Sequence, residues 1–307
     1  MRVSIIIPIY NKKKYTQACL ESIFKFGSKY EFEIIVVDNG STDGSGEYLK
    51  GLSVGSESKV ILIQNEKNLG FAKACNQGAK MAKGEYLLFL NNDTVVAEKW
   101  LDILVQELDT NKNMGIVGPK LLYPDGTVQH AGVVFDKEKW PHHIYKKEKG
   151  DAPYVNKKRQ FQCLTAACFL VRREIFEKVG GFDEAYLNGL EDLDFCLKVC
   201  ALGLGILYCP ESVVYHHESI TEGRSNFDER NVKTFYSRWG EKIKVDYQDY
   251  LTEDGMTGMG EFLDTFHGKK MSYKKFYYLG QRFLVTARRD GLWRAVTKSW
   301  RRLTLKI

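Results

Sequence analysis

Four short apolar runs decide the fold: VSIIIPIY (3–10), EIIVVD (33–38), KVILIQN (59–65) and EYLLFLNND (85–93). The stretches between them carry apolar residues at helical spacing, at 14–26, 44–52 and 71–83. Strands that alternate with helices in this way form a parallel sheet with right-handed crossovers, and near-continuous apolar strands fit a sheet that is buried on both faces. We therefore predict an α/β protein with a Rossmann-like, mainly parallel central sheet flanked by helices.

The second half of the chain continues this pattern with less regular spacing. Its predicted elements are helices at 99–111 and 191–202, strands at 114–119, 162–173 and 205–217, and a polar stretch rich in Lys and His at 136–160. We predict one α/β domain over residues 1–245, with halves that meet near residue 94, and a helical C-terminal extension over 246–307.

Composition limits the class of protein. The 307 residues are 44% hydrophobic and 27% charged, which fits a globular fold and argues against disorder or a polytopic membrane protein. No apolar run approaches the roughly 18 residues of a membrane span, and no signal-peptide cleavage site follows the N-terminus, so we expect an unexported, cytoplasmic protein. Seven cysteines without paired CxxC spacing predict buried, reduced thiols.

Basic charge is concentrated near the C-terminal end. Residues 269–307 hold twelve Lys or Arg against Asp290 alone, a charge of +11 that leaves −5 for residues 1–268 out of a total of +6. Apolar residues recur there at helical spacing, with Trp293 and Trp300 among them, which predicts two amphipathic helices. One interpretation places these helices on an anionic membrane surface, and the other packs them on the domain with their charges solvated. No nucleic-acid partner is expected, because no recognised nucleic-acid-binding motif accompanies these basic residues.

Polar residues follow each of the first four predicted strands, where ligands of parallel sheets bind. Asp38 ends the run EIIVVD, and a carboxylate at that place can accept hydrogen bonds from a base or a ribose. The alternative is an ordinary turn in which Ser41 or Asp43 caps the next helix. The turn after the first strand, PIYNKKK, has no glycine, and no Walker A sequence is present, which argues against a NAD, FAD or P-loop site.

Two further strand ends carry residue types that bind metals. Asn91, Asn92 and Asp93 follow an apolar run, and their oxygens suit Mg2+ or Mn2+ bound to a diphosphate. The alternative is a turn in which Asp93 caps a helix. His216 and His217 end the last predicted strand, where neighbouring side chains face opposite ways, so only one of them can reach a ligand. A neutral imidazole at this end would add a nitrogen ligand for Mn2+.

Three acids begin the predicted helix at 191–202, namely Glu191, Asp192 and Asp194. The helix dipole favours acids at this end whatever their function. Apolar neighbours such as Phe195 nevertheless predict that at least one of these acids points into a partly enclosed cleft. Desolvation there raises the pKa of a carboxyl toward that of a useful general base.

Taken together, these motifs resemble those of the inverting family-two nucleotide-sugar glycosyltransferases with the GT-A fold, especially bacterial rhamnosyltransferase-like enzymes. The resemblance rests on five motifs in order across residues 3–225: SIIIPIYN, VVDNGSTDGS, NEKNLGFAKACNQGAKMAKGEYLLFLNND, GGFDE…LEDLDFCLK and VVYHHESIT. It implies a GT-A catalytic domain over 1–245, with a nucleotide-binding half at 1–94 and an acceptor-binding half at 95–245.

The resemblance also assigns roles to residues. It places nucleotide-sugar binding on Pro8, Tyr10, Asp38, Asn68, Gly70, Lys73 and Asn92. It places a metal cofactor, Mn2+ or Mg2+, on Asp93, Asn91 and His216. Asn91 stands where the family has an acid, and this departure removes one negative charge from the metal site. The catalytic pair falls on Glu191 and Asp192, with Asp192 as the base.

The implied reaction moves a sugar from a UDP- or dTDP-sugar to a hydroxyl of a glycan or lipid-linked acceptor, in the synthesis of cell-surface polysaccharide. Asp192 would take the proton of the acceptor hydroxyl during an in-line displacement that inverts the anomeric configuration. A catalytically silent sugar-nucleotide-binding or scaffold protein is an alternative, motivated by Asn91. A nucleotidyltransferase is a second alternative, but the glycine- and arginine-rich loop that it needs after the first strand is absent.

Overall fold

The computed structural model describes residues 1–53, 60–187, 189–217 and 229–256. The predicted amphipathic helices of the basic tail, within residues 257–307, lie outside the described residues. Within those that are described, no helix is both long enough and apolar enough to cross a bilayer.

The first half of the chain alternates strands and helices as predicted. Its elements are β1 (Val3–Ile9), α1 (Lys13–Phe26), β2 (Phe32–Asp38), α2 (Ser45–Leu52), β3 (Val60–Gln64), α3 (Phe71–Met81) and β4 (Tyr86–Leu90). The predicted strand over 85–93 was too long at its carboxyl end. β4 stops at Leu90, and the three polar residues that follow form a turn.

The second half holds more elements than the sequence predicted. They are β5 (Thr94–Val96), α4 (Trp100–Thr110), β6 (Met114–Leu122), β7 (Val128–His130), β8 (Val133–Phe135), β9 (Pro141–His143), β10 (Arg159–Gln160), β11 (Cys168–Arg172), α5 (Arg173–Lys178), α6 (Glu191–Ala201), β12 (Gly205–His216), α7 (Glu229–Trp239) and α8 (Tyr247–Glu253). The predicted strand over 162–173 shrinks to β11, because residues 162–167 leave the sheet and run beside α6.

The main sheet has the strand order β10-β12-β6-β11-β4-β1-β2-β3, with β5 on β12 and β7 on β6. β1, β2, β3 and β4 are parallel, and β12 is parallel to β6. β11 is antiparallel to both of its neighbours, β4 and β6, so β6 and β12 run in the same direction as β4. The carboxyl ends of β1, β2, β4 and β12 therefore lie at one edge of the sheet.

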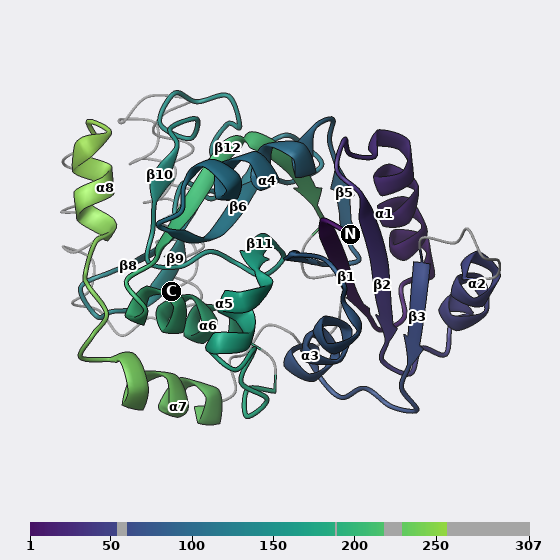
Figure 1. Cartoon of the computed structure of the whole chain (residues 1–307). Coiled ribbons are helices and arrows are strands. Elements are labelled where there is room, and N and C mark those ends of the chain that lie inside the picture. The colour runs from purple at the N-terminus through teal and green to yellow at the C-terminus, as the bar shows by residue number, and fades with distance from the viewer. Residues whose placement is uncertain (54–59, 188, 218–228, 257–307) are drawn as a thin grey trace, which may run out of the picture.

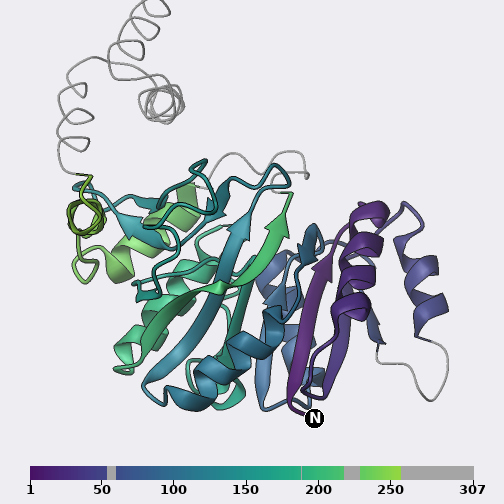
Figure 2. The same ribbon diagram turned by 90° about the horizontal axis from the view of Figure 1, so that it is seen from above.

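Helices cover both faces of this sheet. α1 and α4 lie on one side, and α3, α5 and α6 lie on the other (Figures 1 and 2). Alternate strand residues divide between two cores in agreement with this arrangement: Ile5 packs in the cluster that contains Leu20 of α1, and Ile6 packs in the cluster that contains Cys75 of α3. The strands are apolar throughout because both faces are buried.

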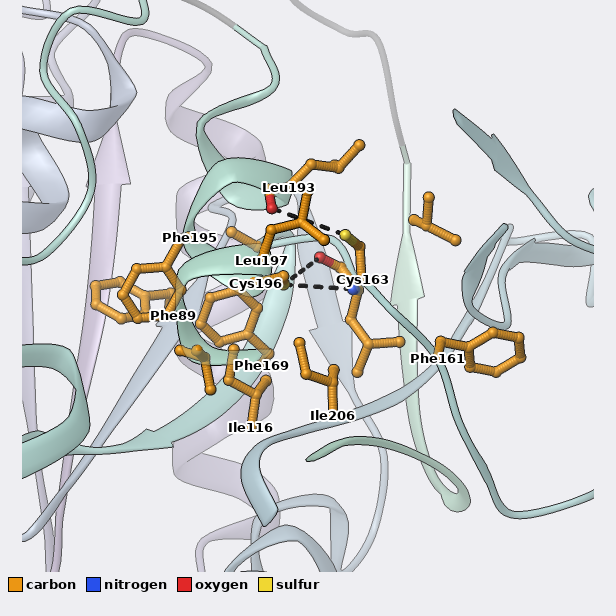
Figure 3. Packing of buried hydrophobic residues seen from close by; sticks show 14 of the residues in the cluster. Phe89, Ile116, Phe161, Cys163, Phe169, Leu193, Phe195, Cys196, Leu197 and Ile206 are labelled. Carbon is orange, nitrogen blue, oxygen red and sulfur yellow. Dashed lines mark hydrogen bonds between the residues drawn. The ribbon is translucent and has the colours of Figure 1, made fainter. Parts of the chain in front are cut away.

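An aromatic cluster joins α6 to the centre of the sheet. The rings of Phe169 on β11 and Phe195 on α6 stack with centroids 5.8 Å apart and planes at 10°. Next to it, the Cys196 thiol donates a hydrogen bond to the Leu164 carbonyl (Figure 3). All seven cysteines are within the described residues and carry free thiols, and all but Cys200 are buried, as predicted.

Contacts with the body continue beyond the predicted boundary at residue 245, which itself stays a prediction. Asp246 accepts a hydrogen bond from the backbone N–H of Phe135 at 2.8 Å. After α8, the carboxylate of Asp254 accepts hydrogen bonds from Arg159 at 2.9 Å and Lys157 at 2.6 Å, and its side chain has no exposed surface.

We predict that Asp254→Ala lowers the free energy of unfolding by about 3–5 kcal/mol, because it leaves the nearly buried guanidinium of Arg159 without its carboxylate. Urea denaturation at pH 7 measures this loss. Asp249→Ala, which removes an exposed acid of the preceding helix α8, should cost well under about 1 kcal/mol.

The loss should also depend on pH. Burial alone would raise the pKa of Asp254, but hydrogen bonds from Arg159, Lys157 and Tyr145 outweigh burial and lower it below its ordinary value of 3.8. The stabilisation is therefore present above that value and disappears as the pH falls through the lowered pKa. A difference between wild type and Asp254→Ala that grows with acidity would contradict this assignment.

Candidate active site

The candidate site lies at the edge where β1, β2, β4 and β12 end. The turn after β4 brings Asp93 to the last residue of β12, since Thr94 on β5 pairs with His216. His216 Nε2 lies 3.1 Å from Asp93 Oδ1 and 3.4 Å from Asn91 Nδ2. Asp93 and His216 are both buried, at 4% and 5% exposure. The structure thus brings together the three residues predicted to bind metal, although 123 positions separate Asp93 from His216.

His216, the last residue of β12, and His217, which follows it, face different neighbours. The ring of His217 packs edge-on against Tyr15 of α1, with centroids 5.0 Å apart. Its backbone N–H donates to the Asp93 carbonyl at 3.0 Å. Of these two histidines, His216 is therefore the one whose side chain contacts the Asp93 carboxylate, as alternation along a strand predicts.

Asn92 lies in the same turn but faces α1. Its Nδ2 donates a hydrogen bond to the Thr16 hydroxyl at 2.9 Å. Asp93 caps no helix, because β5 follows it directly. The alternative of a helix-capping turn at Asp93 is therefore wrong.

Asp38 ends β2 with 2% exposure. Its Oδ1 accepts the backbone N–H of Ser41 at 2.9 Å, so it organises the turn that follows. Ser41 does not cap α2, but Asp43 Oδ1 accepts the backbone N–H of Ser45, the first residue of α2, at 3.1 Å, as the turn alternative predicts. Ile9 pairs with Asp38 in the sheet, which places Pro8 and the exposed Tyr10 at the neighbouring strand end.

The loop before α3 is tied to the end of β2 by side-chain amides. Asn68 Oδ1 accepts the Gly70 N–H at 2.9 Å, and Asn39 Nδ2 donates to the Gly70 carbonyl at 3.2 Å. Asn65 Nδ2 donates to Asn39 Oδ1 at 2.8 Å. Lys73, one turn into α3, is exposed. Asn39 and Asn65 were not predicted as site residues, although each lies within three positions of one that was.

Two features of the structure favour glycine at position 70. Its φ of +89° lies in the region that side chains rarely adopt. A Cβ there would lie 3.0 Å from the carbonyl oxygen of Leu187. The loop at Gly70 therefore contacts the segment that leads into α6.

Asp192 is held at the start of α6 by hydrogen-bond donors. Its Oδ2 accepts the N–H of Ala166 at 3.1 Å, and its Oδ1 accepts the N–H of Leu193 at 2.9 Å. Burial raises the pKa of Asp192, and these N–H groups with the Thr165 hydroxyl offset part of that rise. This is the direction predicted for a general base. Thr165 and Ala166 were missed, because the sequence placed them inside a strand.

The other two acids of α6 have different surroundings. Glu191 is 7% exposed and lies near α3, where burial and then its charge raise the pKa of the Cys75 thiol. Asp194 is fully buried, accepts a hydrogen bond from Trp239 Nε1 at 2.8 Å and forms an ion pair with Lys198 Nζ at 2.8 Å. Asp194 thus joins α6 to α7.

The residues at the edge fit a divalent metal. Neighbouring ligands of an octahedral ion at about 2.1 Å lie about 3 Å apart, close to the 3.1 Å between Asp93 Oδ1 and His216 Nε2. Carboxylate and imidazole suit Mn2+. No group of three or more His, Cys, Asp or Glu in the described part of the chain could hold a metal. This pair would therefore need further ligands, such as Asn91 and phosphate oxygens.

Comparison with known proteins places the chain in a family. The model of "Glycosyl transferase family 2" matches residues 4–180. "O-antigen biosynthesis protein RfbC" of Myxococcus xanthus is 32% identical over 82% of this chain and 20% of its own length. An "N-acetylglucosaminyl-diphospho-decaprenol L-rhamnosyltransferase" of Mycobacterium tuberculosis is 27% identical over 72% of this chain and 77% of its own.

A solved structure has the same fold. "Crystal structure of GalNAc-T7 with UDP, GalNAc and Mn2+" superposes with a TM-score of 0.66 at 20% identity, over 91% of this chain and 54% of that one. The predicted GT-A architecture is thereby confirmed. The chain spans about a fifth of the length of RfbC and about a quarter of that of a relative from Sinorhizobium fredii. On the family match over residues 4–180, this chain belongs to glycosyl transferase family 2.

Proposed function

We propose that the chain is an inverting, metal-dependent glycosyltransferase that moves a sugar from a nucleoside diphosphate to an acceptor hydroxyl. The observation that carries this proposal is the 3.1 Å approach of His216 to Asp93 at the sheet edge where Asp38 also lies. A carboxylate and an imidazole at this edge suit an ion that binds a diphosphate. A scaffold without catalysis would not need them together.

The nucleotide-sugar would bind along the ends of β1 and β2. We assign the base and ribose to Pro8, Tyr10 and Asp38, and the ribose and phosphates to Asn68, Gly70 and Lys73. Asn92, in the turn after β4, completes this set. The donor would be a UDP- or dTDP-sugar; UDP is the nucleotide named with the GalNAc-T7 structure.

Asp93, His216 and Asn91 would hold Mn2+ or Mg2+. When bound, the ion would neutralise charge on the leaving diphosphate. The protein residues contribute one carboxylate, one imidazole and one amide to this site.

Asp192 would act as the base. Its carboxylate takes the proton from the acceptor hydroxyl, the freed oxygen attacks the anomeric carbon, and the bond from that carbon to the diphosphate oxygen breaks. One displacement inverts the configuration. Backbone N–H groups of Ala166 and Leu193 orient the carboxylate before the reaction. Glu191, beside it on α6, completes the catalytic pair.

The acceptor would be a glycan or lipid-linked hydroxyl in cell-surface polysaccharide synthesis. Two relatives support this class, one named for O-antigen biosynthesis and one for rhamnose transfer to a decaprenol-linked sugar. We place the reaction at the cytoplasmic face of a membrane. The basic residues of 269–307 would attract its anionic lipids.

We predict that UDP or dTDP binds in the presence of Mn2+ and that Asp93→Ala weakens this binding at least about 10-fold, because it removes the only carboxylate assigned to the ion. Isothermal titration with UDP, dTDP and GDP, with and without Mn2+, measures this. Glu98→Ala, an exposed acid beyond β5, should bind like wild type. Failure of every nucleotide to bind wild type would favour the scaffold alternative.

We predict that Asp192→Asn lowers kcat by about 10²–10⁴-fold and leaves donor affinity unchanged, because the amide cannot accept the proton. Glu174→Gln, an exposed acid on α5, serves as the matched control. NMR of the product should show an inverted anomeric configuration. A retained configuration, or an Asp192→Asn variant with full kcat, would contradict the assignment.

The pH dependence of kcat/KM should also identify Asp192 as the base. Asp192 must be ionised to accept a proton, and burial raises its pKa above the ordinary 3.8. We predict that kcat/KM of wild type falls as the pH drops through this raised pKa. This decrease in kcat/KM at low pH should be absent from the residual activity of Asp192→Asn.

A further inference from the structure

Gln129 occupies a bulge in β7. Leu121 of β6 pairs with His130, and the next residue, Leu122, pairs with Val128. Gln129 is therefore the extra residue of the short strand, with no opposite partner. A bulge turns the side chain of its extra residue away from the ordinary alternation and is common beside active sites.

The bulge directs Gln129 toward His216. Its Oε1 lies 3.3 Å from His216 Nδ1, and Gln129 is 2% exposed. An amide oxygen only accepts hydrogen bonds, so His216 Nδ1 carries the proton that is donated to it. In the neutral ring, the other nitrogen, Nε2, then carries a lone pair. That nitrogen is the one that faces Asp93 Oδ1 at 3.1 Å.

We propose that Gln129 is a positioning residue that holds His216 in the tautomer with the proton on Nδ1 and aims Nε2 at the metal beside Asp93. This inference rests on the metal-dependent function proposed above. In this state two acceptors, the lone pair of Nε2 and the carboxylate of Asp93, face each other. A cation beside this pair, at about 2.1 Å from each atom, would take both as neighbouring ligands.

The backbone around the bulge is fixed on both sides. Val128 donates its N–H to the Glu148 carbonyl at 2.8 Å and accepts the Lys147 N–H at 2.7 Å. His130, after the bulge, is buried with its Nδ1 2.7 Å from His143 Nδ1. Gln129 is thus supported by neighbours that hold β7 in place, as a precise positioning contact requires.

The test compares three variants. Gln129→Met keeps the length of the side chain but removes the acceptor, and Gln129→Glu keeps an acceptor at the same place. Gln162→Met is the matched control, because it removes a half-buried glutamine that contacts Lys244 and Asp246. Thermal unfolding by circular dichroism establishes that each variant folds. If Gln129→Met does not fold, Gln129→Asn shortens the side chain and removes the contact.

Two readouts are independent of turnover. In the metal-free full chain, 15N NMR of His216 should report the tautomer protonated at Nδ1 in wild type and Gln129→Glu, and a mixture in Gln129→Met. Titration of Mn2+ alone, followed by electron paramagnetic resonance, should show binding about 10–100-fold weaker in Gln129→Met. Gln129→Glu and Gln162→Met should stay within a few-fold of wild type.

The outcomes separate this inference from the proposed function. If wild type binds Mn2+ and Gln129→Met binds it equally well, the role of Gln129 is overturned while the metal site stands. If wild-type His216 carries its proton on Nε2, the role is overturned as well. If wild type binds Mn2+ neither alone nor in the presence of UDP or dTDP, the metal site fails, and the role proposed for Gln129 fails with it.

Discussion

Strand direction is the constraint on which the candidate site depends. β11 runs antiparallel between β4 and β6, and this single reversal leaves β6 and β12 running the same way as β4. His216 therefore reaches the edge at which β4 ends and at which Asp93 lies. If β11 were parallel to only one of its two neighbours, β6 and β12 would end at the opposite edge. The contact between Asp93 and His216 is thus a product of sheet topology rather than of any local motif.

The first turn of α6 gives three neighbouring acids different surroundings. Successive residues of a helix are about 100° apart, so Glu191 lies near α3 while Asp192 faces the segment at 165–166. Asp194 is fully buried and bonded to Trp239 and Lys198. Asp192 accepts its hydrogen bonds from backbone N–H groups rather than from cations, and burial raises its pKa. Position on the helix, and not residue type, separates the proposed base from a structural anchor.

The sequence predicted the regular elements well because each of the first four strands is buried on both faces and therefore apolar. Places at strand ends pointed to Asp93 and to the pair of His216 and His217, and the family resemblance chose His216 from that pair. It missed Thr165 and Ala166, because an apolar run does not reveal that its first half leaves the sheet to contact α6. Gln129 carried no signal at all. Its place follows from the pairing of β7 with β6, a contact between residues that no local pattern encodes.

The amide of Asn91 affects the net charge of the proposed metal site, and this charge affects how the site would bind the leaving diphosphate. His216, neutral in the tautomer that Gln129 favours, and the amide of Asn91 add no charge, so Asp93 is the single anion of the three. A divalent ion held by this set would keep a net charge of about +1, whereas an acid at position 91 would cancel it. The remaining charge would attract a diphosphate. On this argument Asn91 weakens the hold of the protein on a free ion, and the nucleotide supplies the missing negative charge, so ion and donor would bind together.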